Sequence, residues 1–216
     1  MPQKFDPINF SADITADSEF DASLSSDRYT SRDFMEKEWD MLWTQCWLFA
    51  GIRSDLKEPG DFFIYDIGRE SIIVTLNENL EVSAFYNTCQ HRGNKILTID
   101  SGWVKQVSCP YHGWTYSLKG ELIKIPDEEL FGKGICKKEK SLKEVSVEVW
   151  AGLIFINMGD KPAPLKTFLG SILEQLSPYH FENMVLVKHQ SVTLDTNWKT
   201  ASCLLYTSDA ADDLRC

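Results

Sequence analysis

The chain has 216 residues, of which 43% are hydrophobic, 25% charged and 12% aromatic, the composition of a globular protein with one or two domains. Its formal net charge of −10 argues against non-specific binding to nucleic acid or to an anionic membrane. No apolar run reaches the roughly 18 residues of a membrane span, and the acidic N-terminus is neither a signal nor a transit peptide. We therefore expect a cytoplasmic protein whose six cysteines are not paired as disulfides.

The N-terminal region begins with residues 1–28, which are polar and acidic and predict an extended arm. A helix is predicted over residues 31–45, inside a unit of residues 29–46, because its apolar side chains recur every three or four positions. Thr30 is the expected N-cap of this helix. Cys46 lies on the same apolar stripe and is expected in the core.

Short strands separated by turns follow over residues 47–158 and predict a small antiparallel β unit. The expected strands are residues 61–66, 71–75, 81–86, 103–108, 114–118, 121–125, 144–150 and 153–157. After a Pro-rich linker, residues 165–176 repeat their apolar side chains at helical spacing. Residues 184–194 alternate as a strand does, so we expect a second domain to begin within residues 159–201.

Two short motifs in the β unit carry candidate metal ligands, with a Cys-x-His pair in the first and a Cys-x-x-His pair in the second. The motifs are Cys89-Gln90-His91-Arg92-Gly93 and Cys109-Pro110-Tyr111-His112-Gly113-Trp114. This donor set fits a [2Fe–2S] cluster with mixed ligands. Cys89 and Cys109 are expected to hold one iron as thiolates. His91 and His112 are expected to hold the other iron as neutral imidazoles.

Five other residues of the two motifs are expected to surround these ligands, where backbone comes close to the cluster and its N–H groups tune the reduction potential. They are Arg92, Gly93, Tyr111, Gly113 and Trp114. A Cys2His2 zinc site is the alternative for the same four ligands. Zinc sites usually pair Cys with Cys and His with His, whereas each pair here is mixed, so the pattern favours the iron–sulfur cluster.

Both motifs resemble the Rieske motif, in the form found in the α subunits of ring-hydroxylating Rieske non-haem iron oxygenases. Residues 47–51, 59–61 and 149–157 and the segment Asn197-Trp198-Lys199 also resemble these subunits. Respiratory-type Rieske proteins have a further cysteine in each loop, and neither loop of this chain has one. The resemblance implies a mainly β Rieske domain with an N-terminal helix, followed by the truncated start of an α+β helix-grip catalytic domain.

In function, the resemblance implies a mono- or dioxygenase that receives electrons from a ferredoxin or an NAD(P)H-dependent reductase. The cluster would relay them to a mononuclear non-haem iron that uses O₂ to hydroxylate an aromatic or other organic substrate. The resemblance also implies a homotrimer, with or without a β subunit, in which His112 contacts a bridging aspartate of the neighbouring subunit. A stand-alone Rieske ferredoxin-like electron carrier is the alternative function.

The catalytic iron of this family has two His ligands and one carboxylate, which follow the Asn-Trp-Lys segment. Seventeen residues follow Lys199, and none is a histidine. We therefore expect a fragment without the catalytic iron site and inactive alone, in which His180 and His189 are surface or strand histidines. Residues 202–216 resemble the translation of a sequencing-library adapter, and we expect a non-native tail that includes Cys203 and Cys216.

Cys136 lies in a lysine-rich loop and is expected as a partly exposed free thiol. The lysines of residues 133–143 could form an ordinary solvated face or help to dock an acidic ferredoxin. Solvated faces are the commoner role of such charge runs.

Overall fold

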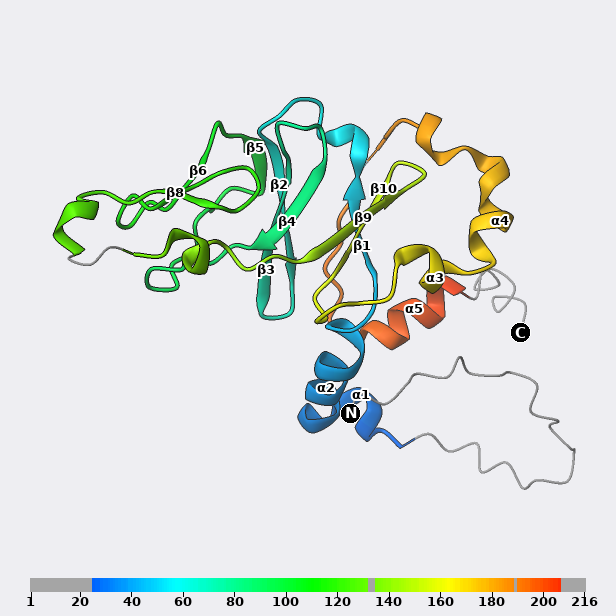
Figure 1. Ribbon diagram of the computed structural model, residues 1–216. Helices are drawn as coiled ribbons and strands as arrows, with labels where there is room; N and C mark the ends of the chain where they lie inside the picture. Colours follow the sequence, from blue (N-terminus) through cyan, green and yellow to red (C-terminus); the bar gives the residue numbers. More distant parts are fainter. Residues whose placement is uncertain (1–24, 132–134, 189, 207–216) are drawn as a thin grey trace, which may run out of the picture. The chain divides into compact units, whose positions relative to one another are not determined.

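The computed structural model describes residues 25–131, 135–188 and 190–206 (Figure 1). The chain divides into two compact units, one of Met1–Phe34 with Thr196–Cys216 and one of Met35–Asp195. The larger unit holds both candidate metal-binding motifs. None of the described helices is both long enough and apolar enough to cross a membrane.

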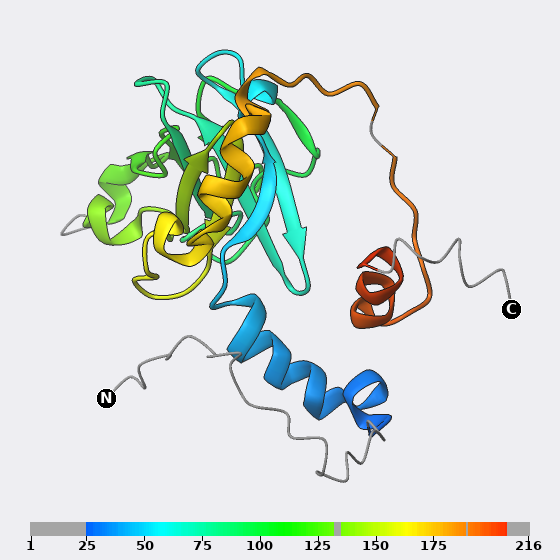
Figure 2. The same ribbon diagram turned by 90° about the vertical axis from the view of Figure 1, so that its right-hand side faces the viewer.

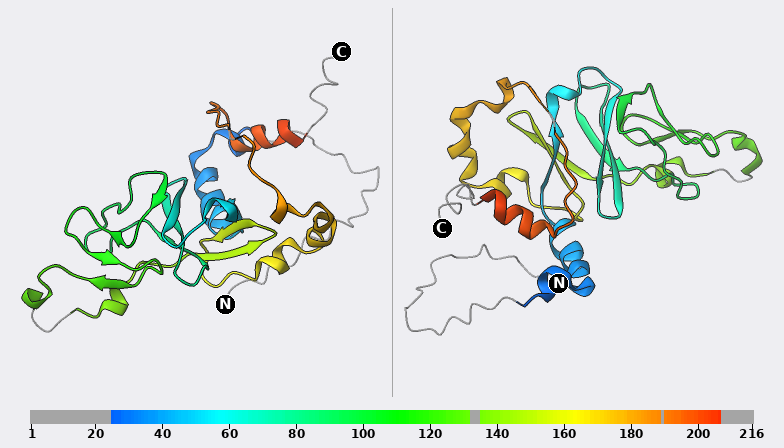
Figure 3. Two further views of the ribbon diagram at one scale, coloured as in Figure 1. Left: turned by 90° about the horizontal axis from the view of Figure 1, so that it is seen from above. Right: turned by 180° about the vertical axis from the view of Figure 1, so that it is seen from behind.

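The described part of the larger unit contains three antiparallel sheets. Their strand orders are β1-β10-β9, β4-β3-β2-β5 and β6-β7-β8. The strands are β1 (Leu48–Ile52), β2 (Asp61–Ile67), β3 (Glu70–Leu76), β4 (Val82–Tyr86), β5 (Ser101–Trp103), β6 (Val107–Ser108), β7 (Thr115–Tyr116), β8 (Leu122–Lys124), β9 (Ser146–Trp150) and β10 (Leu153–Asn157). In Figure 3 the green β6–β8 sheet lies at one end of this unit and the β1-β10-β9 sheet at the other. The mainly β fold expected from the sequence is confirmed.

Strand β3 separates two hydrophobic cores, because successive side chains of a strand point to opposite faces. Ile73 faces the core that lies under the two motif loops, together with Phe62 and Phe85. Ile72 and Val74 face the second core, which is completed by the β1-β10-β9 sheet. Since both faces of β3 are covered, its residues from Ile72 to Leu76 are all buried.

The predicted helix over residues 31–45 consists of two pieces, α2 (Arg32–Glu38) and a π-helix, η1 (Trp39–Trp43). The expected N-cap, Thr30, is wrong by one residue, because Ser31 precedes α2 directly. Thr30 lies within a separate short helix, α1 (Asp27–Thr30), and the Ser31 hydroxyl accepts the Phe34 N–H at 3.4 Å. Residues 27 and 28 are therefore helical, although they were expected in the extended arm.

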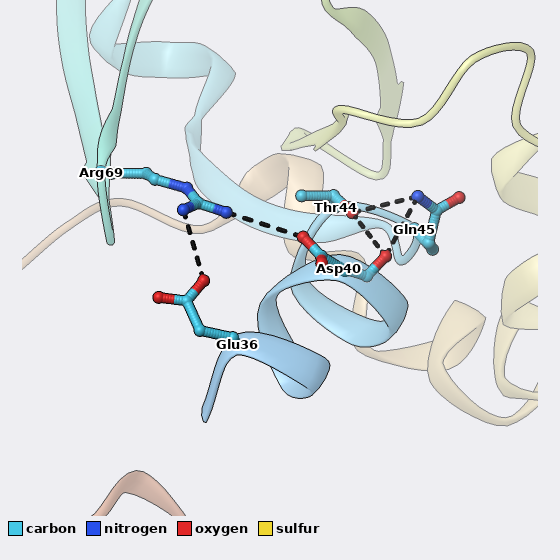
Figure 4. Close-up of polar contacts among 5 residues, drawn as sticks. All are labelled: Glu36, Asp40, Thr44, Gln45 and Arg69. Carbon is cyan, nitrogen blue, oxygen red and sulfur yellow. Dashed lines mark hydrogen bonds and ion pairs between the residues drawn. The ribbon is translucent and has the colours of Figure 1, made fainter. Parts of the chain in front are cut away.

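An exposed polar cluster joins the helical segment to the β2–β3 turn (Figure 4). Arg69 contacts the carboxylates of Glu36 at 3.3 Å and Asp40 at 3.6 Å. Its guanidinium lies 5.2 Å from the centre of the Trp39 ring. Asp40 also accepts, through its carbonyl, the Thr44 hydroxyl at 3.0 Å. The Arg69 contacts link the helical segment to the β2–β3 turn, whereas the Thr44 bond lies within the segment.

The predicted helix over residues 165–176 is interrupted. It forms α3 (Leu165–Leu169) and α4 (Ile172–Leu176), because Gly170 between them takes a φ of +52°, which is not helical. Leu165 is buried, and its N–H donates to the Glu148 carboxylate of β9 at 3.1 Å. Figure 2 shows both helices alongside the sheet formed by β1, β9 and β10.

The predicted strand over residues 184–194 is wrong for the described residues 184–188 and 190–194, which form no strand. An alternating pattern becomes a strand only where a neighbour completes its hydrogen bonds. Val185 and Val187 are 79% and 93% exposed, as expected for apolar side chains without a sheet around them. In the smaller unit, α5 (Trp198–Tyr206) follows, and Lys199 lies against the aromatic rings of Tyr29 and Trp198.

The remaining short 3-10 helices are η2 (Arg53–Asp55), η3 (Glu128–Phe131), η4 (Lys137–Lys140), η5 (Ser177–Tyr179) and η6 (Phe181–Asn183).

Candidate iron–sulfur site

The two motifs form loops with the same backbone design, although His follows Cys by two residues in the first and by three in the second. In each loop the Cys N–H donates to the carbonyl five residues on, and the Gly N–H donates back to the Cys carbonyl. The bonds are Cys89 to Asn94 (2.9 Å), Gly93 to Cys89 (2.9 Å), Cys109 to Trp114 (2.8 Å) and Gly113 to Cys109 (3.0 Å). Two matching loops of this kind can each present one thiol and one imidazole to the same bound metal group.

The four candidate ligands form a sulfur pair and an imidazole pair. Cys89 and Cys109 are 2% and 3% exposed and belong to the same hydrophobic core. Burial raises the pKa of the Cys89 thiol, and this outweighs the hydrogen bonds from Tyr116 and the His91 backbone, which lower it. The rings of His91 and His112 lie with their centres 4.7 Å apart. The two loops therefore bring all four side chains to one place on the protein surface.

His91 carries a buried polar atom that needs a partner. Its Nδ1 is shielded from solvent and has no hydrogen-bond partner among the described residues. The ring stacks on Trp114 at 4.8 Å. Burial lowers the pKa of His91, and the charges of His112, Arg92 and Lys140 lower it further, which favours the neutral imidazole. A buried, neutral imidazole nitrogen without a hydrogen bond is suited to bind a metal ion.

The other expected residues lie around the pairs. Tyr111 is exposed, and its ring centre is 3.9 Å from that of His112. Arg92 is also exposed, and its charge acts on His91. Gly93 and Gly113 have φ values of +75° and +70°, the left-handed region in which glycine is favoured.

The sequence interpretation missed two side chains that reach the sulfur pair. The Tyr116 hydroxyl lies 3.3 Å from the Cys89 Sγ and accepts the Gln90 N–H at 3.1 Å. Burial and the bond to Cys89 raise the pKa of Tyr116, so it stays protonated and can donate to a thiolate. Asn94 of the first loop lies 3.9 Å from the Cys109 Sγ of the second. Tyr116 lies two positions after Trp114, and residues two apart in a strand point to the same face. This spacing is the one sequence signal that places the Tyr116 side chain inward.

The pairing bears on the choice between iron and zinc. A single zinc ion draws its four ligands around one point. A [2Fe–2S] cluster needs two separate pairs, one on each iron, and the buried thiols and the facing imidazoles form two such pairs.

The two loop glycines allow a matched test of backbone fit. A Cβ on Gly113 would lie 3.0 Å from the Pro126 side chain, whereas a Cβ on Gly93 would meet nothing within 4 Å. In both variants the alanine must adopt the left-handed backbone conformation, which destabilises the fold by about 1–2 kcal/mol. We expect Gly113→Ala to lower the thermal midpoint more than Gly93→Ala, measured by calorimetry. Equal losses would show that Pro126 imposes no constraint on the second loop.

The described part of the larger unit contains three further cysteines and histidines, Cys46, Cys136 and His180. Cys136 is an exposed free thiol, as expected. Cys46 was expected in the core but is half-buried, and burial raises its pKa. His180 is exposed and lies 3.3 Å from the Glu182 carboxylate. His189 is outside the described residues.

Comparison with known proteins agrees with this geometry. Residues 46–142 match the Rieske [2Fe-2S] domain family. The chain is 30% identical over 188 residues to the glycine betaine monooxygenase oxygenase subunit of Pseudomonas aeruginosa, covering 87% of this chain and 43% of that protein. It is 31% identical over 183 residues to the benzene 1,2-dioxygenase α subunit of Pseudomonas putida, covering 81% and 40%. The chain thus spans less than half the length of these curated relatives.

Solved structures give the same result. A quaternary ammonium Rieske monooxygenase superposes with a TM-score of 0.78 at 27% identity, over 83% of this chain and 50% of that chain. Naphthalene 1,2-dioxygenase superposes with a TM-score of 0.66 at 32% identity, over 69% and 34%. The chain therefore contains a Rieske [2Fe–2S] domain and belongs with the Rieske oxygenase α subunits, whose N-terminal part it matches.

Proposed function

We propose that this chain binds a [2Fe–2S] cluster and relays single electrons to a mononuclear iron elsewhere in a Rieske oxygenase. Cys89 and Cys109 would hold one iron, and His91 and His112 would hold the other. The observation that carries this proposal is the arrangement of two buried thiols beside two facing imidazoles, one of which has an unpartnered buried nitrogen. When bound, the cluster supplies one-electron oxidation and reduction at a potential raised by its two neutral ligands.

The thiol pair and the imidazole pair lie in different surroundings. Cys89 and Cys109 lie in the hydrophobic core, which excludes water from the sulfur side. His112 is exposed, so the imidazole side can be approached by a partner. The stacking of Trp114 on His91 fixes one imidazole plane. A buried sulfur side and an open imidazole side suit electron exchange at the protein surface.

The wider assignment to an oxygenase rests on the relatives. Those named above are one monooxygenase subunit and one dioxygenase subunit. We propose O₂-dependent hydroxylation of an organic substrate by the full-length protein, with a ferredoxin or NAD(P)H-dependent reductase as electron donor and a homotrimeric assembly. In this proposal residues 159–201 begin the domain that holds the catalytic iron.

The direct test of cluster binding is analysis of the purified chain after anaerobic reconstitution. We expect two iron atoms and two sulfides per chain, with visible absorption and a rhombic EPR signal in the reduced state. Stoichiometric zinc in colourless protein would instead support the zinc alternative.

The Tyr116 hydroxyl offers a smaller test of the same site. A hydrogen bond to a sulfur ligand stabilises the more negative, reduced state, so we expect Tyr116→Phe to lower the midpoint potential. The expected shift is on the order of 50 mV, since about 1.4 kcal/mol corresponds to 59 mV for one electron. Potentiometric EPR measures it, and Tyr179→Phe is a control because that tyrosine is exposed and its ring lies against Phe181, not against a candidate ligand. An unchanged potential in Tyr116→Phe would remove this residue from the site.

A further inference from the structure

Asn87 is a buried amide at the end of β4, directly before the first motif loop. It is 1% exposed. Its side-chain oxygen accepts the N–H groups of Ile96 at 3.0 Å and Leu97 at 2.9 Å. Its side-chain nitrogen donates to the Leu97 carbonyl at 2.7 Å and to the Ser71 hydroxyl at 3.3 Å. An amide can accept two hydrogen bonds and donate two, so all four positions of Asn87 are used.

These bonds fasten both ends of the first loop to one residue. The chain leaves Asn87, passes through Cys89 and His91, and returns to the same amide at Ile96 and Leu97. The Asn87 backbone N–H also donates to the Ser71 carbonyl of β3 at 2.8 Å, which ties the whole arrangement to a central strand.

The two loops are held by different means. The second loop is flanked by β6 and β7, which pair through Val107 with Tyr116 and Ser108 with Thr115. The first loop is flanked by an isolated bridge between Thr88 and Lys95. The hydrogen bonds of the Asn87 side chain therefore hold the two ends of the first loop together, as the paired strands do at the second loop.

We propose that Asn87 is a positioning residue, which sets the places of Cys89 and His91 relative to the second loop. This inference rests on the proposed cluster ligation by those two residues. Removing the amide would leave the Ile96 and Leu97 N–H groups without their side-chain acceptor. This is costly because both residues are buried. The loop would then shift to find other partners, and both ligands would move with it.

Asn77 provides a matched control at the opposite end of β4. It is also a buried amide, 3% exposed, and follows β3. Its oxygen accepts the N–H groups of Asn79 at 2.9 Å and Glu81 at 3.2 Å, and its nitrogen donates to the Ser83 hydroxyl at 3.0 Å. It closes the β3–β4 turn and touches neither motif loop.

The experiment compares the reconstituted full chain with its Asn87→Ala and Asn77→Ala variants. Both variants should lose thermal stability. Only Asn87→Ala should shift the EPR g-values and the midpoint potential, and its cluster retention against a chelator should fall about tenfold or more, as found when residues behind metal ligands are removed. If Asn87→Ala does not fold, Asn87→Asp keeps the acceptor for Ile96 and Leu97 and should give a smaller shift of the same kind.

The possible outcomes separate the two proposals. A wild-type chain without a histidine-ligated cluster would overturn the proposed function itself. A wild-type chain with that cluster, and variants at both positions with unchanged g-values and potential, would overturn the positioning role of Asn87 alone. A shift confined to the Asn87 variants would support it.

Discussion

Replacing His112 with alanine should abolish the rhombic EPR signal of the reduced protein. His112 faces His91 across 4.7 Å and is the more exposed of the two imidazoles. Without it, one iron would keep a single protein ligand in the proposed site. The loss of cluster should exceed the roughly 10- to 100-fold effect of removing a group behind a ligand. Visible absorption, iron content and EPR of the reconstituted variant measure it.

His180→Ala is the matched control for this variant. His180 is also an exposed histidine, and its ring contacts the Glu182 carboxylate, away from both motif loops. Its spectra and iron content should equal those of the unchanged chain. A cluster with unaltered g-values in His112→Ala would show that this imidazole is not a ligand.

Replacing Phe85 with alanine should destabilise the fold by about 3–5 kcal/mol, the usual cost of removing a buried Phe ring. Phe85 has 0% exposure and belongs to the core that also contains Cys89 and Cys109. Its ring lies 3.2 Å from where a Cβ on Gly120 would be, so the site is tightly packed. The free energy of unfolding from denaturant titration checks this value.

Phe49→Ala is the control for the Phe85 variant. Phe49 is 51% exposed on β1, and its main aromatic contact is the Phe155 ring at 6.0 Å. Because most of its ring is already in water, the loss should be well below that of Phe85→Ala. Comparable losses at both positions would contradict the placement of Phe85 in the core beneath the loops.

The sequence was most informative where chemistry restricts the residue type. Two Cys/His motifs predicted the residues that the loops bring together, because few side chains can bind the irons of a cluster. It was silent on Asn87 and Tyr116, whose roles depend on contacts between segments distant in the chain. Tyr116 reaches Cys89 across 27 positions, a pairing that no local pattern reveals.

Elements were predicted well where local pattern and neighbours agree. Strands β2 to β4 follow the expected ranges closely, since each has a partner within a few residues. The strand over residues 184–194 failed because alternation alone does not provide a partner. The helix over residues 165–176 failed at Gly170, whose positive φ no apolar period predicts.

The most direct test of the account is pulsed EPR of the reduced protein with ¹⁵N-labelled histidine. Two imidazole nitrogens bound to one iron, from His91 and His112, should give two strong ¹⁵N couplings. The His112→Ala variant should lose this pattern, and His180→Ala should retain it. A reduced cluster without histidine couplings would contradict the proposed ligand set, even if iron and sulfide were present.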